Sequence, residues 1–161
     1  MTRTTRIALL GAALLGVILM WGRLVDGVIF HPSPGADLRP EQLGLAGEDV
    51  FLTTEDGVRI HAFWLPAEGA TRALLFLHGN AGNASHRLPN AAELVRLGAH
   101  VLLLDYRGYG LSEGRPSEAG VYDDARAGLA HLLETRSLEE ERIVVFGRSL
   151  GGAVAVDVRG Y

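Results

Sequence analysis

Short, uninterrupted apolar runs recur along the sequence from residue 73 onward, at residues 73–77, 101–104 and 143–146. Runs of this length, rich in Leu, Val and Ile, are typical of parallel strands that are covered on both faces. Polar, glycine-rich residues follow each run, and longer segments that suit helices lie between the runs. The repeated order of strand and helix predicts an α/β fold, with a mostly parallel sheet and right-handed crossovers.

Two helices and one hairpin complete the predicted elements. Residues 85–97 and 117–133 have the length and mixed polarity of helices. In the second of these, the apolar positions form one stripe at helical spacing: Val121, Tyr122, Ala125, Leu129, Leu132 and Leu133. Residues 48–54 and 58–65, separated by a Glu-Asp-Gly turn, predict an antiparallel β-hairpin ahead of the parallel strands.

Three glycine-rich loops come directly after the predicted parallel strands, at residues 78–83, 105–114 and 147–152. In open α/β sheets the active site lies beyond the carboxyl ends of the strands. We therefore expect any catalytic chemistry of this chain to be carried by these loops.

The last loop reads Gly-Arg-Ser-Leu-Gly-Gly between a predicted strand and a helix-compatible segment. In a Gly-x-Ser-x-Gly turn of this kind, the serine hydroxyl projects from the strand end toward the positive end of the next helix. Gly147 and Gly151 remove Cβ atoms that would clash with the neighbouring chain. Ser149 is therefore the candidate nucleophile for acyl transfer. The alternative is a tight glycine turn in which Ser149 only caps the helix.

The loop at residues 78–83 reads His-Gly-Asn-Ala-Gly-Asn. A glycine-rich loop at a strand end can direct backbone N–H groups at a developing oxyanion. We expect the oxyanion hole to use the backbone N–H groups of Asn80 and Leu150, with Gly79 as the loop glycine. The alternative is a plain turn into the next helix, with Asn83 or Ser85 as its cap.

Three other polar side chains near these loops are expected to be structural. His78 should support its loop rather than act as a base. Asp105 and Arg107 follow a buried strand directly, and we expect them to brace the next turn through hydrogen bonds and an ion pair.

Residues 78–83, 105–118 and 147–152 appear in this order, and together they resemble the α/β-hydrolase superfamily. They are most similar to its membrane-anchored, single-domain branch, which includes protein depalmitoylases and lysophospholipase-like esterases. The resemblance runs from about residue 30 to residue 161. It implies a serine hydrolase that cleaves an ester, thioester or amide through an acyl-enzyme on Ser149, without a cofactor.

The sequence departs from the superfamily pattern after Ser149. The acid and the histidine of the triad follow the nucleophile in that superfamily, whereas none of the six histidines here does so. The resemblance therefore implies that both groups lie beyond residue 161, that the sheet is truncated after the elbow helix, and that the 161-residue chain alone is inactive. Two alternatives stay open: an inactive, truncated membrane-anchored protein with a relic elbow, and catalysis by an upstream base, for which His78 is the candidate.

Composition narrows the possible partners. A formal net charge of −4 gives no basic surface for nucleic acid. The absence of cysteine excludes disulfides, thiol catalysis and cysteine metal sites. The histidines lack the clustered spacing of metal sites, so we expect no metal, and the resemblance to serine hydrolases implies no cofactor. The resemblance implies a small-molecule or lipid-like acyl compound as the substrate.

The N-terminal residues 1–27 read as a targeting segment. Two arginines precede residues 7–22, which carry no charge and would span about 24 Å as a helix, against about 30 Å of hydrocarbon core. We expect an uncleaved membrane anchor with the body on the extracytoplasmic side. Secretion after signal cleavage is the alternative. Residues 28–47, rich in Pro and Gly, form an irregular connector, and residues 48–161 form the partial α/β-hydrolase domain.

Overall fold

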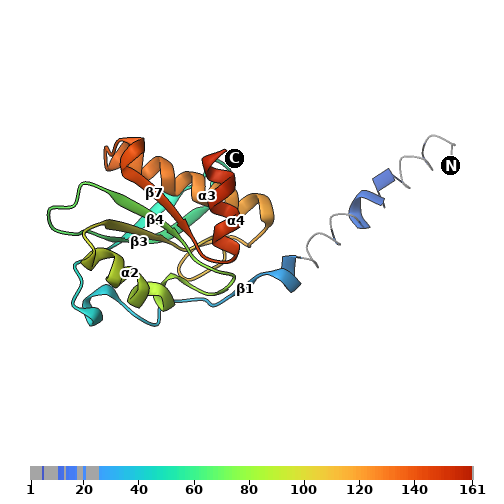
Figure 1. Ribbon diagram of the computed structural model, residues 1–161. Helices are drawn as coiled ribbons and strands as arrows, with labels where there is room; N and C mark the ends of the chain where they lie inside the picture. Colours follow the sequence, from blue (N-terminus) through green and yellow to red (C-terminus); the bar gives the residue numbers. More distant parts are fainter. Residues whose placement is uncertain (1–4, 6–10, 13, 18–19, 21–25, 161) are drawn as a thin grey trace.

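A five-stranded sheet forms the centre of the computed structural model, which describes residues 5, 11–12, 14–17, 20 and 26–160 (Figure 1). The strands lie in the order β2-β3-β6-β4-β7. Their bounds are Glu48–Thr53 for β2, Arg59–Leu65 for β3, Ala73–Leu77 for β4, His100–Leu104 for β6 and Ile143–Gly147 for β7. β4 runs parallel to β6 and β7, whereas β3 runs antiparallel to β2 and β6. The mostly parallel sheet and its preceding hairpin are therefore confirmed.

Helices cover both faces of the sheet (Figure 1). α2 (Leu88–Arg96) packs on one face, and α3 (Glu118–Ala130) and α4 (Leu150–Arg159) pack on the other. Adjacent residues of β4 divide between the two layers, because successive side chains of a strand point to opposite faces. Leu75 joins the cluster beneath α3 and α4, and Phe76 joins the cluster beneath α2.

Side-chain caps mark the start of the 3₁₀ turn before α2 and the start of α3. Asn83 caps a 3₁₀ turn, Ala84–Arg87, which leads directly into α2 with Pro89 in its first turn. The side chain of Ser117 caps α3 by accepting a backbone hydrogen bond at 3.2 Å. A π-helical turn, His131–Thr135, continues α3 without a break. Both predicted helices therefore form, and Asn83 caps the 3₁₀ turn that leads into the first of them.

The predicted connector lies against the domain and contains little regular structure. β1 (His31–Pro32) pairs in parallel with β5 (Ala81–Gly82), which belongs to the loop after β4. A 3₁₀ turn, Pro40–Leu43, lies between β1 and the hairpin. We call residues 29–37 the strap, because they cross the loop after β4.

Most of the predicted anchor at residues 1–27 lies outside the described residues, and it stays a prediction. Among the residues that are described, no helix is long and apolar enough to cross a membrane. In the same part of the chain, no group of three or more His, Asp or Glu residues is placed to hold a metal ion.

Candidate active site at the nucleophile elbow

Ser149 lies between β7 and α4 in a backbone conformation that residues with a side chain rarely adopt. Its φ is 54° and its ψ is −116°, a conformation that costs on the order of 1–3 kcal/mol. Its side chain makes no capping hydrogen bond to α4, and the residue is exposed. Ser149 thus occupies the N-cap position of α4 without a side-chain cap, and its role as the nucleophile stays a prediction.

Two glycines make this turn possible. A Cβ on Gly147 would lie 2.0 Å from the carbonyl oxygen of Gly151, and a Cβ on Gly151 would lie 2.0 Å from that of Leu77. Backbone hydrogen bonds from Arg148 to Leu77 (3.1 Å) and from Gly151 to Arg148 (3.0 Å) hold the turn in place. The elbow therefore packs directly on the end of β4, with no room for a side chain at either glycine.

The loop after β4 lies beside the serine. A Cβ on Gly79 would be 3.5 Å from the Cβ of Ser149. Leu150 is the first residue of α4, so its N–H has no acceptor within the helix. Within the described part of the chain, no backbone carbonyl accepts the Asn80 N–H. The loop that carries Asn80 and the helix that begins at Leu150 thus meet at Ser149. The oxyanion role of the two N–H groups stays a prediction.

His78 is fully buried beneath this loop. Its Nδ1 lies 2.6 Å from the carbonyl oxygen of Gly79, and its ring packs against Tyr106 and Tyr109 with centroid distances of 4.7 and 5.2 Å. Its Nε2 lies 3.5 Å from Oδ1 of Asp105, at ion-pair distance but without hydrogen-bond geometry. Both ring nitrogens are therefore directed at structural partners, which fits the supporting role expected from the sequence.

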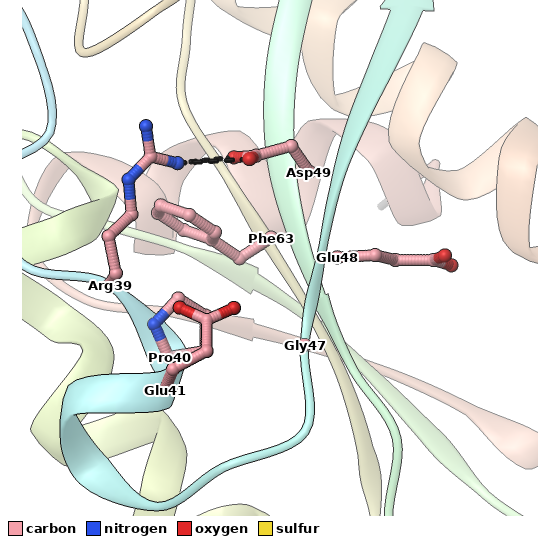
Figure 2. A pocket seen from close by; sticks show the side chains of 7 residues that line it. All are labelled: Arg39, Pro40, Glu41, Gly47, Glu48, Asp49 and Phe63. Atoms are coloured by element: carbon pink, nitrogen blue, oxygen red, sulfur yellow. Dashed lines mark hydrogen bonds and ion pairs between the residues drawn. The ribbon is translucent and has the colours of Figure 1, made fainter.

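Asp105 lies at the centre of a buried polar chain. Its Oδ1 accepts a hydrogen bond from the backbone of Ala84 at 2.7 Å, and its Oδ2 lies 3.3 Å from Nδ1 of His61. His61 is fully buried on β3, and its Nε2 lies 2.7 Å from Oδ1 of Asp49 on β2. Asp49 also pairs with Arg39 at the rim of a cavity of about 290 Å³, beside the hairpin (Figure 2). The chain thus connects the hairpin with the loop that carries Asn80.

The polar chain keeps Asp105 ionised. Burial alone would raise the pKa of the Asp105 carboxyl, but the hydrogen bond from His61 and the interaction with His78 outweigh it. The pKa of Asp105 therefore lies below its ordinary value of 3.8. In the sequence, the only local sign of this series of polar contacts is His61, which lies in the middle of an apolar strand. None of the three loop motifs includes that position.

Arg107 braces the turn after β6, as predicted. Its backbone N–H and its Nε donate to Asp124 at 2.7 and 2.9 Å, and its guanidinium also pairs with Asp56 at 2.7 Å. Burial raises the pKa of Asp124 to about 6 in spite of these bonds. The hydrogen bond from Arg107 lowers the pKa of the exposed Asp56 to about 2. Arg107 therefore joins α3 to the hairpin turn.

A mostly parallel sheet, covered on both faces and carrying a strained serine at a strand-to-helix turn, defines the α/β-hydrolase class. The family model of the serine aminopeptidases, S33, matches residues 69–159, which is more than half of the chain. The chain therefore belongs to this family within the α/β-hydrolase superfamily, and the resemblance noted from its three motifs is confirmed at that level.

Several curated proteins are similar to this chain. The alpha/beta hydrolase domain-containing protein WAV2 of Arabidopsis thaliana is 46% identical over 125 residues, covering 76% of this chain and 41% of that protein. The uncharacterized protein Rv2307c of Mycobacterium tuberculosis is 40% identical over 152 residues, covering 93% and 54%. The chain thus spans about half the length of the curated relatives it matches.

Solved structures agree on the fold. The esterase Pf2001 of Pyrococcus furiosus superposes with a TM-score of 0.69 and 29% identity, covering 81% of this chain and 52% of the esterase. An alpha-beta hydrolase of Vibrio vulnificus superposes with a TM-score of 0.64 and 30% identity, covering 70% and 39%. Both likenesses concern about half or less of the compared protein.

Proposed function

We propose that this protein is a serine hydrolase that cleaves an ester, thioester or amide through an acyl-enzyme on Ser149. The observation that carries the proposal is the conformation of Ser149. Its backbone is strained, with a φ of 54°, and Gly147 and Gly151 make this conformation possible. A Cβ atom on either glycine would lie 2.0 Å from a backbone carbonyl oxygen. Strain of this kind persists where the surrounding structure enforces it, and such residues cluster at active sites.

In the proposed reaction the Oγ of Ser149 attacks the carbonyl carbon of the substrate and loses its proton to a histidine base. Charge then develops on the carbonyl oxygen, where the N–H groups of Asn80 and Leu150 stabilise it. The leaving group departs with the proton that the histidine returns, and water later hydrolyses the acyl-enzyme by the same route.

The base and its orienting acid are proposed to lie beyond residue 161, as the family order implies. His78 is less suited to the role of base, because its Nδ1 faces the carbonyl oxygen of Gly79 and its Nε2 faces Asp105. Residues 1–161 alone are therefore proposed to be inactive, since a serine hydroxyl without a base is a weak nucleophile at neutral pH.

The proposed substrate is a small-molecule or lipid-like acyl compound, processed at a membrane surface by a body on the extracytoplasmic side. A cavity of about 570 Å³ lies where the strap meets the loop before α3, and Phe30, Pro32 and Pro116 contribute to its lining. Secretion after signal cleavage is the alternative to an anchor. No nucleic acid and no cofactor enter this proposal.

The test uses the full product of the gene that encodes this sequence. Ser149→Ala should abolish labelling by a fluorophosphonate probe, and it should lower ester turnover by about a millionfold. Ser137→Ala is the matched control, because Ser137 is exposed and also has a positive φ, of 53°. Activity that survives in a folded Ser149→Ala protein would reject the nucleophile. Absence of activity and labelling in the folded parent would favour the second candidate, an inactive membrane-anchored protein with a relic elbow.

A further inference from the structure

We propose that the strap and the side chain of Asn80 are positioning parts of the active site, which hold the N–H of Asn80 toward the oxyanion. This inference rests on the proposed function, because it assigns a second task to a residue whose backbone that function already uses. The sequence motif predicts a role for the backbone of Asn80 alone. In the structure, the side chain of Asn80 forms hydrogen bonds with the backbone of the strap.

Both the oxygen and the nitrogen of the Asn80 side-chain amide form hydrogen bonds. Its Oδ1 accepts from the backbone N–H of His31 at 3.2 Å and from the hydroxyl of Tyr109 at 3.0 Å. Its Nδ2 donates to the backbone carbonyl of Ile29. One side chain therefore joins the oxyanion loop both to the strap and to the loop after β6.

The strap holds the same loop at a second point. His31 and Pro32 pair in register with Ala81 and Gly82, and the backbone N–H of Ser33 donates to the carbonyl of Gly82 at 3.0 Å. The Nδ2 of Asn83 then bridges two strap carbonyls, at 3.2 and 3.0 Å. The residues that follow Asn80 in the loop are therefore tied to the strap as well.

The strap is in turn fixed to the loop after β6. Gly35 donates to the carbonyl of Gly110 at 2.8 Å, and Gly110 donates to that of Ser33 at 3.0 Å. Phe30 is buried in the main core with 6% of its surface exposed, and Tyr109 is fully buried. The strap thus lies between two site loops, bonded to both and held by one core side chain.

Hydrogen bonds are needed here because Asn80 lies between two small residues, Gly79 and Ala81, which supply little side-chain packing beside it. Gly82 follows in the same loop, with a φ of 91° that other residues rarely adopt. Stabilisation of an oxyanion requires donors that are fixed before the charge develops, since reorganisation would cost part of the gain. A loop rich in glycine meets this requirement only if other groups fix it, and the Asn80 amide fixes it from two sides.

The test compares kcat in Asn80→Ala and Tyr109→Phe of the full gene product, with a nitrophenyl ester as substrate. Asn90→Ala and Tyr122→Phe are the matched controls, because both positions lie on helices away from the loop, Asn90 exposed and Tyr122 half-buried. Active sites are counted by fluorophosphonate titration, so that kcat refers to correctly folded protein. Binding of a trifluoromethyl ketone, which forms an oxyanion on the serine, reports on the hole directly.

We expect kcat per titrated site to fall about tenfold to a hundredfold in Asn80→Ala with KM nearly unchanged. Affinity for the ketone should fall by the same factor. Tyr109→Phe should cost about three- to tenfold, the effect of one neutral hydrogen bond. The double variant should be no worse than Asn80→Ala, because Tyr109 acts through Asn80.

A purely structural role would lower the melting temperature and the titrated fraction, but it would leave kcat per titrated site and ketone affinity within about twofold of the controls. That result overturns the proposal. If Asn80→Ala does not fold, Tyr109→Phe decides by the same two readouts, since it removes one hydroxyl and adds no volume. Retained hydrolysis in Ser149→Ala would reject the proposed function itself, whereas loss there without loss in Asn80→Ala rejects only the positioning role.

Discussion

At the scale of single residues, the conformation of Ser149 depends on the absence of Cβ atoms at two nearby glycines. Gly147 and Gly151 approach the backbone so closely that even a methyl group has no place. The sequence predicts this part of the site well, because the elbow is local and its glycines lie within two residues of the serine. The hydrogen bonds of the Asn80 side chain could not be predicted, since their partners come from segments distant in the chain.

Two adjacent glycines, Gly151 and Gly152, should respond in opposite ways to replacement by alanine. Gly151→Ala should destabilise the protein by about 1–3 kcal/mol or more, because its Cβ would lie 2.0 Å from the carbonyl oxygen of Leu77. Gly152→Ala should be neutral or stabilising by up to about 1 kcal/mol, since its Cβ would meet the nearest atom at 3.8 Å in a helix. Urea denaturation measures both. Equal stability of the two variants would contradict the packing described for the elbow.

At the scale of elements, the strands were predicted almost to the residue and the sheet order was not. Apolar runs identify β4 and β6 because both faces of these strands are covered, and the run of β7 identifies that strand although Val144 and Phe146 are exposed. The antiparallel contact of β3 with β6 depends on the whole sheet, and no local pattern indicates it. The same holds for His61, whose partners Asp49 and Asp105 come from two other segments.

The buried polar chain leads to a prediction about elements. Asp105→Asn should lower the free energy of unfolding by about 3–5 kcal/mol at neutral pH, because it removes one partner of a buried charged cluster. The folded pKa of Asp105 lies below 3.8, so its stabilising effect is complete above that pH and is lost as the pH falls through the folded pKa. The difference in unfolding free energy between the variant and the parent should therefore become smaller in acid.

Denaturation from neutral to acid pH measures this difference, with Asp123→Asn as the control, since Asp123 pairs with Arg126 near the surface of α3. A difference in unfolding free energy that stays constant into acid would mean that folding does not lower the pKa of Asp105.

At the scale of the whole molecule, residues 1–27 are predicted to determine where the protein is found. If residues 1–27 are an anchor, the full gene product should fractionate with membranes and resist carbonate extraction. Removal of residues 1–22 should release it, because the uncharged stretch at residues 7–22 is then gone. Both are measured by blotting of membrane and soluble fractions. A mature N-terminus near Val28, found by mass spectrometry, would instead identify a cleaved signal.

The strap also bears on the order in which the protein matures. Residues 29–37 are synthesised early, yet their partners lie as far along the chain as Asn80 and Gly110. Contacts between distant segments form late, because the chain between them must first be ordered. During synthesis, residues 29–37 therefore leave the ribosome well before the loop at residues 78–83 can adopt its final conformation. If the proposed function holds, hydrolytic activity is expected only after residues 29–37 have paired with the loop after β4.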